Sequence, residues 1–489
     1  MRFRVVLGVL GTAILLFSPV FVVPLGVALI YGEPTIFQFM LCTGIAVFLG
    51  LGCFAVRARR ALRARDAFLI VTLVYFAISA LAALPLLLIP NIAASIPDAL
   101  FEAVSMVTTT GATVLVGLDE MPKSVLMYRQ IVCWFGGMGI IVLVVAILPM
   151  LGIGGAQLIR AELSNDQNKL SVPLRVRETA ETLWKIYVGM TALCAVSLWL
   201  AGMTPFDAIA HSFSTVAIGG LSTHDLSIGY FNSATIECVM IVFIVIAGCN
   251  FMLHYAAIHR PGRHTGRISH FFRTYTRDAQ IRFYFVALIF TCTLICIKLA
   301  LDSDYHGNLF REGIFHSVSF LTTAGFTTTD LNAWTSMAPV VLLYVSFIGA
   351  CAGSTGGGFK VFRVVILFKQ GVREIQQLLH PGAIFQARMN GKNISDRMLE
   401  STVGFVSVYV LCFAVLLGAM MFVSSLDLIT AFSAVAACLN NLGPGLGAVA
   451  TNYHSLADLD KCILIFAMIL GRLEIFTLLV LFAPRYWRR

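Results

Sequence analysis

Four short glycine-centred segments recur between long apolar runs, and their backbone could bind a cation. Glycine reaches positive φ at little steric cost, so carbonyl groups beside it can turn toward a common axis. Rings of such carbonyls replace the water shell of a dehydrated ion in channel filters. Four copies in one chain therefore predict four equivalent units around an ion pathway. The segments are TTTGATV around Gly111, AIGGLST around Gly220, TTAGFTT around Gly325 and NNLGPGL around Gly443.

The candidate ligands are the backbone carbonyls of each central glycine and of its two neighbours. Aligning the segments on the glycine also pairs Ser105 with Ser214 and Ser319 without a gap. An alternative is that these small residues only let membrane helices pack closely. The shared register favours a filter over close packing. The ligand set is Thr110, Gly111, Ala112, Gly219, Gly220, Leu221, Ala324, Gly325, Phe326, Leu442, Gly443 and Pro444.

The composition of the chain indicates an all-α polytopic membrane protein. Of 489 residues, 58% are apolar and only 12% are charged, against about 25% charged in soluble domains. About 20 helical residues cross a hydrocarbon core, and ten apolar runs approach or exceed this length. They leave no room for a sizeable soluble domain. The runs are 5–30, 36–56, 67–90, 125–151, 182–201, 234–257, 283–301, 336–358, 401–423 and 460–483.

A short amphipathic segment precedes each glycine segment and predicts a re-entrant half-helix. These segments are 98–105, 206–213, 310–317 and 427–433, each too short to span a bilayer. Non-helical backbone at membrane depth must face protein or a water-filled cavity, so the glycine segments face inward. The repeated order predicts a pseudo-fourfold, single-chain pore. Its parts are two extra N-terminal helices (1–60) and pore units 1 (66–160), 2 (178–262), 3 (278–372) and 4 (396–489).

Basic residues at the membrane edges orient the chain. Arginines cluster between the second and third runs, from Arg57 to Arg65, and between the sixth and seventh, from Arg260 to Arg282. The positive-inside rule makes both loops cytoplasmic, and the connection 162–177 and both termini then lie inside. The half-helices enter from outside and point their partly negative C-terminal ends inward, which favours a cation. The net charge of +9 therefore does not indicate nucleic acid.

The eighth run contains a candidate gate below the filter. It carries Gly353, Ser354, Thr355, Gly356, Gly357 and Gly358, followed by Lys360. Each glycine costs a helix interior about 1 kcal/mol relative to alanine, so the helix is predicted to break here. Phe359 interrupts the ending of a phosphate-binding loop, which argues against a nucleotide site. The break could form a loop across the pore, or it could only allow a close helix crossing.

Charged and titratable residues in the apolar runs are further candidates. Arg472 lies in the tenth run, where a guanidinium is costly unless it is paired or hydrated. We expect it to face the cavity and raise the barrier to cations, with pairing to Glu474 as the alternative. His211 and His316 occupy equivalent half-helix positions and could relay protons or only bond locally. The other two units have no histidine there, so no fourfold titrating ring exists.

At these residues the chain resembles the Trk/Ktr/HKT superfamily of potassium transporters, and most closely its TrkH family. The resemblance implies potassium uptake across the cell inner membrane and a gating role for the broken helix. It also implies a homodimer, and a cytosolic, nucleotide-binding, TrkA-like regulatory subunit. Potassium is then the transported ion, no cofactor is covalent, and membrane lipid is the remaining partner. The motifs are TTTGAT at 108–113, HSFSTVAIGGLSTHD at 211–225, FLTTAGFTTTD at 320–330, GACAGSTGGGFKVFR at 349–363, NNLGPGLG at 440–447 and GRLEIFT at 471–477.

Two other classes of function fit the sequence less well. A secondary transporter with inverted repeats is disfavoured because the four units run in the same direction. A membrane enzyme is disfavoured because the glycine segments hold no nucleophile–base pair, metal-ligand spacing or nucleotide motif. The 12 cysteines show no disulfide or zinc spacing either. We therefore predict a transporter and not an enzyme, with channel-like flux and symport both left open.

Overall fold

The computed structural model describes residues 3–56, 64–142, 172–259, 267–303, 305–334 and 337–488. Nearly all regular structure in this part of the chain is helical. The helices and strands are α1 (Phe3–Phe17), η1 (Ser18–Phe21), α2 (Val22–Tyr31), α3 (Ile36–Ala55), α4 (Ala64–Leu88), α5 (Ile96–Val107), η2 (Leu118–Glu120), α6 (Lys123–Val142), α9 (Val172–Leu200), α10 (Pro205–Ala217), η4 (Ser227–Phe231), α11 (Ala234–Ala247), α12 (Phe251–His259), α13 (Arg267–Arg277), α14 (Ala279–Ala300), α15 (Leu309–Leu321), η5 (Leu331–Ala333), α16 (Ala338–Ser346), α17 (Val361–Leu379), β1 (Arg388–Met389), β2 (Lys392–Asn393), α18 (Asp396–Val423), α19 (Leu428–Leu439), η6 (Gly447–Val449), α20 (Asp458–Arg472), α21 (Phe476–Phe482) and α22 (Pro484–Trp487).

Helices occupy each of the ten apolar runs, which confirms the all-α membrane class. Among the described residues, six helices are long and apolar enough to cross a membrane in one piece. Two further pairs would qualify if each sharply bent pair is one span. The six are Phe3–Tyr31, Ile36–Ala55, Arg65–Leu88, Thr179–Leu200, Ala279–Ala300 and Asp396–Val423.

The sixth and tenth runs are bent, whereas the sequence predicted one uninterrupted span for each. Helices α11 and α12 meet at 87°, and α20 and α21 meet at 114°. At the second bend, Glu474 and Ile475 have φ of 53° and 52°, which a right-handed helix cannot accommodate. At the first bend, Asn250 Oδ1 accepts a hydrogen bond from the Met252 amide at 2.9 Å and starts the new helix. In both runs, the bend is set by residues at the break itself, namely Asn250 in the sixth run and Glu474 with Ile475 in the tenth.

The break predicted in the eighth run is present, and it is longer than expected. Helix α16 ends at Ser346, and non-helical backbone continues from Phe347 to Lys360. The sequence placed the start of the break at Gly353. Gly349 has φ of 71°, and a Cβ there would lie 2.2 Å from the Gly357 carbonyl oxygen. The chain therefore folds back on itself before the predicted glycines begin.

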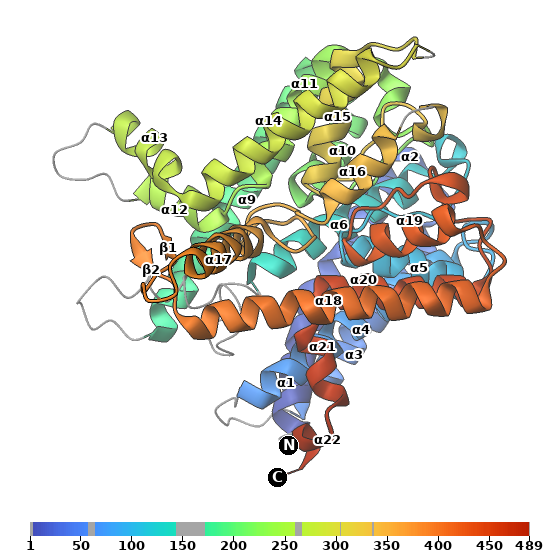
Figure 1. Cartoon of the computed structure of the whole chain (residues 1–489). Helices are drawn as coiled ribbons and strands as arrows, with labels where there is room; N and C mark the ends of the chain where they lie inside the picture. Colours follow the sequence, from blue (N-terminus) through green and yellow to red (C-terminus); the bar gives the residue numbers. More distant parts are fainter. Residues whose placement is uncertain are drawn as a thin grey trace.

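The four predicted half-helices are α5, α10, α15 and α19, and Figure 1 shows them together in the right half of the view. Each begins with a side chain that accepts a hydrogen bond from the backbone amide three residues later, which is the preferred N-cap arrangement. Each helix ends directly before its glycine segment. The four caps are Ser95, Thr204, Asn308 and Asp427.

Ion pairs join each predicted pore unit to the next one, and the fourth to the first. Several of these side chains are buried, and removal of one partner from a buried pair costs about 3–5 kcal/mol because a charge is left unpaired. The pairs therefore fix the order of the units as 1–2–3–4–1. They are Asp119 with His224, Glu237 with Arg311 at 2.8 Å, Arg363 with Glu474 at 2.5 Å, and Lys461 with Asp98 at 2.6 Å.

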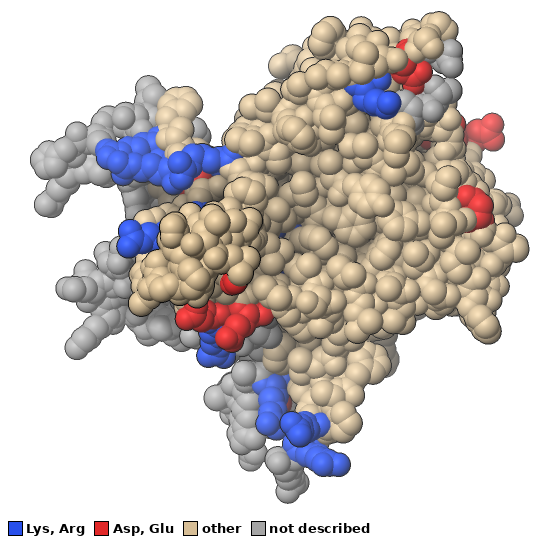
Figure 2. Space-filling model, viewed as in Figure 1, with Lys and Arg blue, Asp and Glu red and all other residues tan. Residues whose placement is uncertain are grey.

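Charged side chains are unevenly distributed over the surface. Figure 2 shows most of the visible Lys and Arg at the end that carries α13, the β1–β2 hairpin and the chain termini, with Asp and Glu both in a cluster beside this basic end and scattered along the opposite edge. The arginines at 57–63, Arg260, Arg263 and residues 162–171 lie outside the described residues. The cytoplasmic placement of both termini therefore stays a prediction.

Candidate ion pathway

The four glycine segments share one backbone conformation. The residue two positions before each glycine has a positive φ, and so does the glycine itself. Left-handed conformations at alternate positions turn the backbone sharply after the helix. The paired values are 51° and 82° at Thr109 and Gly111, 53° and 66° at Ile218 and Gly220, 63° and 75° at Thr323 and Gly325, and 52° and 102° at Asn441 and Gly443.

Close backbone contacts join the four glycines into a closed ring. In every unit, the space where a Cβ would stand is occupied by a carbonyl oxygen of the next unit, from the residue before its glycine. Only glycine leaves room for such an approach. The distances from an ideal Cβ position to that oxygen are 2.5 Å from Gly111 to Gly219, 2.4 Å from Gly220 to Ala324, 1.9 Å from Gly325 to Leu442 and 2.7 Å from Gly443 to Thr110.

Three of the predicted ligands have carbonyls that already accept hydrogen bonds from side chains, namely Leu221, Phe326 and Gly443. The Leu221 carbonyl accepts hydrogen bonds from Ser214 Oγ at 2.8 Å and Gln130 Nε2 at 3.0 Å. The Phe326 carbonyl accepts one from Ser319 Oγ at 2.7 Å. Ser214 and Ser319, which are equivalent when the segments are aligned, therefore hold the carbonyl of the residue after the glycine in units 2 and 3.

A cavity of about 420 Å³ opens beside the ring, and all four central glycines line it. Water occupies about 30 Å³ per molecule in the liquid, so the cavity has room for a hydrated ion. Its wall carries the carboxylates of Asp225 and Asp330, which favour cations. Tyr453 also lines it and donates a hydrogen bond to the Gly443 carbonyl at 2.8 Å. The cavity therefore lies directly against the ring of glycines.

In units 1, 2 and 3, the half-helix residue nine positions before the central glycine forms a hydrogen bond with a group only 11 or 12 residues away in the sequence. Glu102 and His316 each accept the backbone amide three residues after their own glycine, at 3.1 and 3.3 Å. In unit 2, His211 Nε2 lies 3.0 Å from Ser222 Oγ. These contacts favour local hydrogen bonding over a proton relay for the two histidines.

The non-helical residues 347–360, here named the pore loop, pack against the C-terminal ends of three half-helices. Cβ atoms built on Gly356 and Gly357 would lie 2.6 and 1.9 Å from carbonyl oxygens of units 3 and 4. Lys360 donates to the Gly356 carbonyl within the loop. The loop therefore lies across the C-terminal ends of these half-helices. Its donors reach units 2, 3 and 4 through Thr355 Oγ1 to Val216 O at 3.1 Å, Gly357 N to Thr323 Oγ1 at 2.6 Å and Gly358 N to Asn440 O at 3.1 Å.

Arg472 ties the pore loop to unit 1. Its side chain is 2% exposed, and its guanidinium donates to the Thr355 carbonyl at 2.9 Å and the Gly136 carbonyl at 3.3 Å. Glu474 instead pairs with Arg363 at 2.5 Å. The alternative in which Arg472 pairs with Glu474 is therefore wrong, because the bend at 474 directs that carboxylate to unit 3.

The sequence predictions missed two buried polar residues of α6, Arg129 and Gln130. Arg129 is 1% exposed and pairs with Glu102 at 2.8 Å, and Gln130 is fully buried. The sequence does hold an indication of this, because Arg129 is an ionisable residue inside an apolar run and such residues are candidates for a functional role. Their partners, however, belong to two different units.

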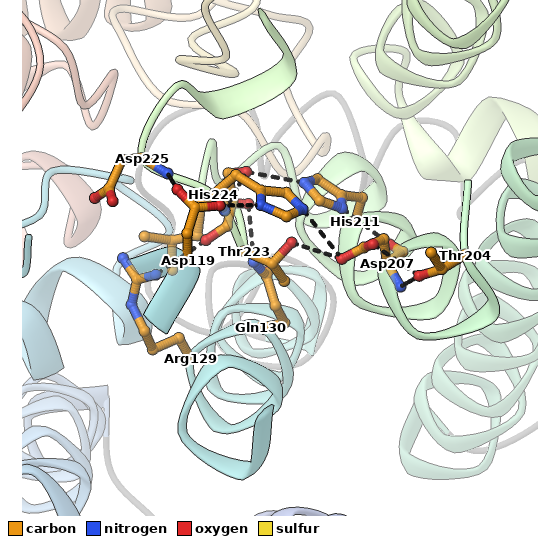
Figure 3. A network of polar contacts seen from close by, with 11 residues as sticks. Asp119, Arg129, Gln130, Thr204, Asp207, His211, Thr223, His224 and Asp225 are labelled. Carbon is orange, nitrogen blue, oxygen red and sulfur yellow. Dashed lines mark hydrogen bonds and ion pairs between the residues drawn. The ribbon is translucent and has the colours of Figure 1, made fainter. Parts of the chain in front are cut away.

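A second missed network joins units 1 and 2 around His224, on the wall of the same cavity (Figure 3). Its Nδ1 contacts Asp119, its Nε2 lies 3.5 Å from Asp207 Oδ1, and its ring stacks on Tyr230 with 3.5 Å between centroids. Both ring nitrogens face carboxylates, an arrangement that favours the imidazolium form. Burial lowers the pKa of His224, but hydrogen bonds and charges of Asp207 and Asp119 outweigh it and raise the pKa.

Raising the pH is expected to loosen this junction. A histidine whose pKa is raised by folding contributes its full stabilisation of the folded chain when the pH is below its ordinary pKa of about 6.5. That contribution is lost as the pH rises through the higher pKa of the folded state. We expect the midpoint of thermal unfolding to fall by about 1–2 °C more in the wild type than in His224→Gln between pH 6 and pH 9. Equal pH profiles for the two proteins would contradict the charged pair.

Comparison with known proteins places this geometry in a family. A family model described as "TrkH: Cation transport protein" matches residues 35–489. The chain is 47% identical to the "Trk system potassium uptake protein TrkH" of Vibrio parahaemolyticus serotype O3:K6, over 100% of both chains. It is 45% identical to the TrkH protein of Escherichia coli strain K12 over 100% of both, and 38% identical to TrkG of that strain over 99% of both.

The fold agrees along the whole chain as well. The crystal structure of the potassium transporter TrkH from Vibrio parahaemolyticus has a TM-score of 0.91 to this chain at 44% identity, and covers 100% of both chains. The matching family consists of transporters, in agreement with the prediction that the chain is not an enzyme. A match over residues 35–489 and relatives similar from end to end show that this chain belongs to the TrkH family of cation transport proteins.

Proposed function

We propose that this protein takes up potassium across the cell inner membrane as the translocating subunit of a Trk-type system. The observation that carries the proposal is the closed ring of glycines and carbonyls contributed by all four units. Such oxygens can replace the hydration shell of a potassium ion. The printed names of the relatives, which are Trk system potassium uptake proteins, support potassium as the cargo. No covalent cofactor is needed for this activity.

The filter comprises the twelve residues predicted from the sequence, with unequal roles. The innermost ligands are the carbonyls before each glycine, at Thr110, Gly219, Ala324 and Leu442, together with those of the glycines. Ala112, Leu221, Phe326 and Pro444 form the outer edge, where side-chain donors already hold two of the carbonyls. The half-helix dipoles end at the ring and favour a cation. Because side chains hold the carbonyls unequally in the four units, we expect the filter to discriminate between ions less strictly than four identical segments would.

The pore loop serves as the gate, through residues 353–358 and Lys360. Its non-helical backbone supports a movable loop over a close helix crossing, and its contacts with three units support a position across the ion's path. The positive charge of Arg472 adds an electrostatic barrier beneath the filter. A TrkA-like, nucleotide-binding cytosolic subunit would regulate flux by shifting this loop.

The remaining assignments extend the same proposal. The chain is organised as two N-terminal helices followed by pore units 1 to 4, with both termini in the cytoplasm. It functions as a homodimer in contact with membrane lipid and binds no nucleic acid. The ion pairs between consecutive units support this division of the chain.

Flux measurements with the purified protein in liposomes test the proposal. Potassium and rubidium are expected to pass, with sodium and lithium less favoured, because a ring of carbonyls discriminates by how well it replaces water. Protein-free vesicles are the control. Sodium flux equal to potassium flux would contradict the filter. Potassium flux that ignores an imposed proton gradient would favour channel-like movement over proton symport.

A further inference from the structure

The glycine segment of unit 2 differs from the other three because it lacks polar side chains of its own. No residue from Val216 to Leu221 carries one, whereas the equivalent stretches hold threonines or asparagines. Those side chains form part of the local support, as when Thr323 Oγ1 accepts the Gly357 amide and Asn441 Nδ2 donates to Thr110 Oγ1. The segment of unit 2 is therefore held by side chains that lie outside this stretch, which include Ser214 of its own half-helix.

Two adjacent residues of unit 1 provide much of that support. Gln130 Nε2 donates to the Leu221 carbonyl at 3.0 Å, and the Arg129 guanidinium donates to the Ser222 carbonyl at 3.0 Å. Both side chains are buried and project from α6 toward unit 2. Consecutive carbonyls directly after Gly220 are thus held by consecutive residues of the neighbouring unit.

The same guanidinium also holds the segment of unit 1. Arg129 Nε donates to Glu102 at 2.8 Å, and its third nitrogen donates to Thr113 Oγ1 at 3.1 Å. Glu102 in turn accepts from Thr113 Oγ1 at 2.9 Å and from the Val114 amide at 3.1 Å. A planar guanidinium can donate to all of these acceptors at once, whereas the ammonium group of a lysine cannot reproduce this geometry. One side chain therefore sets the spacing of two filter segments.

This spacing bears on ion discrimination, because a Cβ at Gly111 would lie only 2.5 Å from the Gly219 carbonyl oxygen. The replacement of water by carbonyls depends on where those oxygens stand and how firmly they are held. We infer that Arg129 and Gln130 are positioning residues that set potassium-over-sodium selectivity by fixing the filter segment of unit 2 relative to unit 1. The inference rests on the proposed potassium uptake function.

The test compares rubidium and sodium uptake into liposomes for Gln130→Met and Arg129→Lys. Gln130→Met keeps the length of the side chain and removes the donor that unit 1 contributes to the Leu221 carbonyl, while Ser214 Oγ still donates to it. Arg129→Lys keeps the charge and removes the planar guanidinium. We expect the rubidium-to-sodium ratio to fall about five-fold for Gln130→Met, the size of effect that one lost hydrogen bond has, and about ten-fold for Arg129→Lys. Rubidium flux itself should persist in both variants.

Gln280→Met is the matched control. Gln280 is also a buried amide whose Oε1 has no partner, like that of Gln130, but it lies at the start of α14 away from the glycine segments. The rubidium-to-sodium uptake ratio of Gln280→Met should equal that of the wild type. An unchanged ratio in folded, monodisperse Gln130→Met would overturn the inference even if Arg129→Lys failed to fold. A wild type without selectivity would instead defeat the proposed function.

Discussion

Gly325→Ala is expected to reduce rubidium uptake by at least about ten-fold. Gly325 has φ of 75°, and a residue with a side chain pays about 1–2 kcal/mol in that region, where 1.4 kcal/mol corresponds to a factor of ten. A Cβ would also lie 1.9 Å from the Leu442 carbonyl oxygen. Because that atom is rigid backbone on the ring itself, relief of the overlap must displace a proposed ligand. Uptake into liposomes at equal protein content measures the effect.

Gly404→Ala is the control for this substitution. Gly404 lies in the membrane helix α18, and a Cβ built on it would have no atom within 4 Å. Its replacement should leave uptake unchanged, or slightly stabilise the helix, since alanine favours helices by about 1 kcal/mol over glycine. Wild-type flux and selectivity in Gly325→Ala would mean that the glycine ring does not line the ion pathway.

Arg472→Gln is expected to raise uptake by about ten-fold when no regulatory subunit is present. The substitution removes a buried positive charge close to the proposed gate and weakens the ties to the Thr355 and Gly136 carbonyls. Hydrogen bonds from charged groups contribute about 1.5–3 kcal/mol each, so their loss favours release of the pore loop. Rubidium uptake into liposomes, with the chain alone, measures the change.

Arg472→Lys separates the two effects of this residue. A lysine keeps the positive charge, but its single ammonium does not match the planar fork of the guanidinium. Flux near the wild-type level would assign the barrier mainly to charge, and flux near that of Arg472→Gln would assign it to the tether. Unchanged or reduced uptake in a folded Arg472→Gln protein would rule out both roles.

Local features of this chain, which depend on one residue and its immediate neighbours, could be predicted from the sequence. Gly325 and its three equivalents were identifiable because only glycine suits their conformation without strain. The half-helices were identifiable from short amphipathic stretches at equivalent positions, and the broken eighth run from its clustered glycines. Even there, the start of the break at Phe347 was missed, because it depends on Gly349 contacting Gly357 after the chain folds back.

The pairing of polar groups across units is a property of the folded chain alone. Glu474 pairs with Arg363, 111 residues away, and not with nearby Arg472, and Gln130 holds Leu221 from 91 residues away. Helix periodicity and hydropathy describe one segment at a time, whereas these contacts depend on how four similar units pack around a common axis. A buried charge in an apolar run shows that a partner must exist. The identity of that partner is set by packing, and so the residues proposed to hold the filter segments in place became visible only in the tertiary structure.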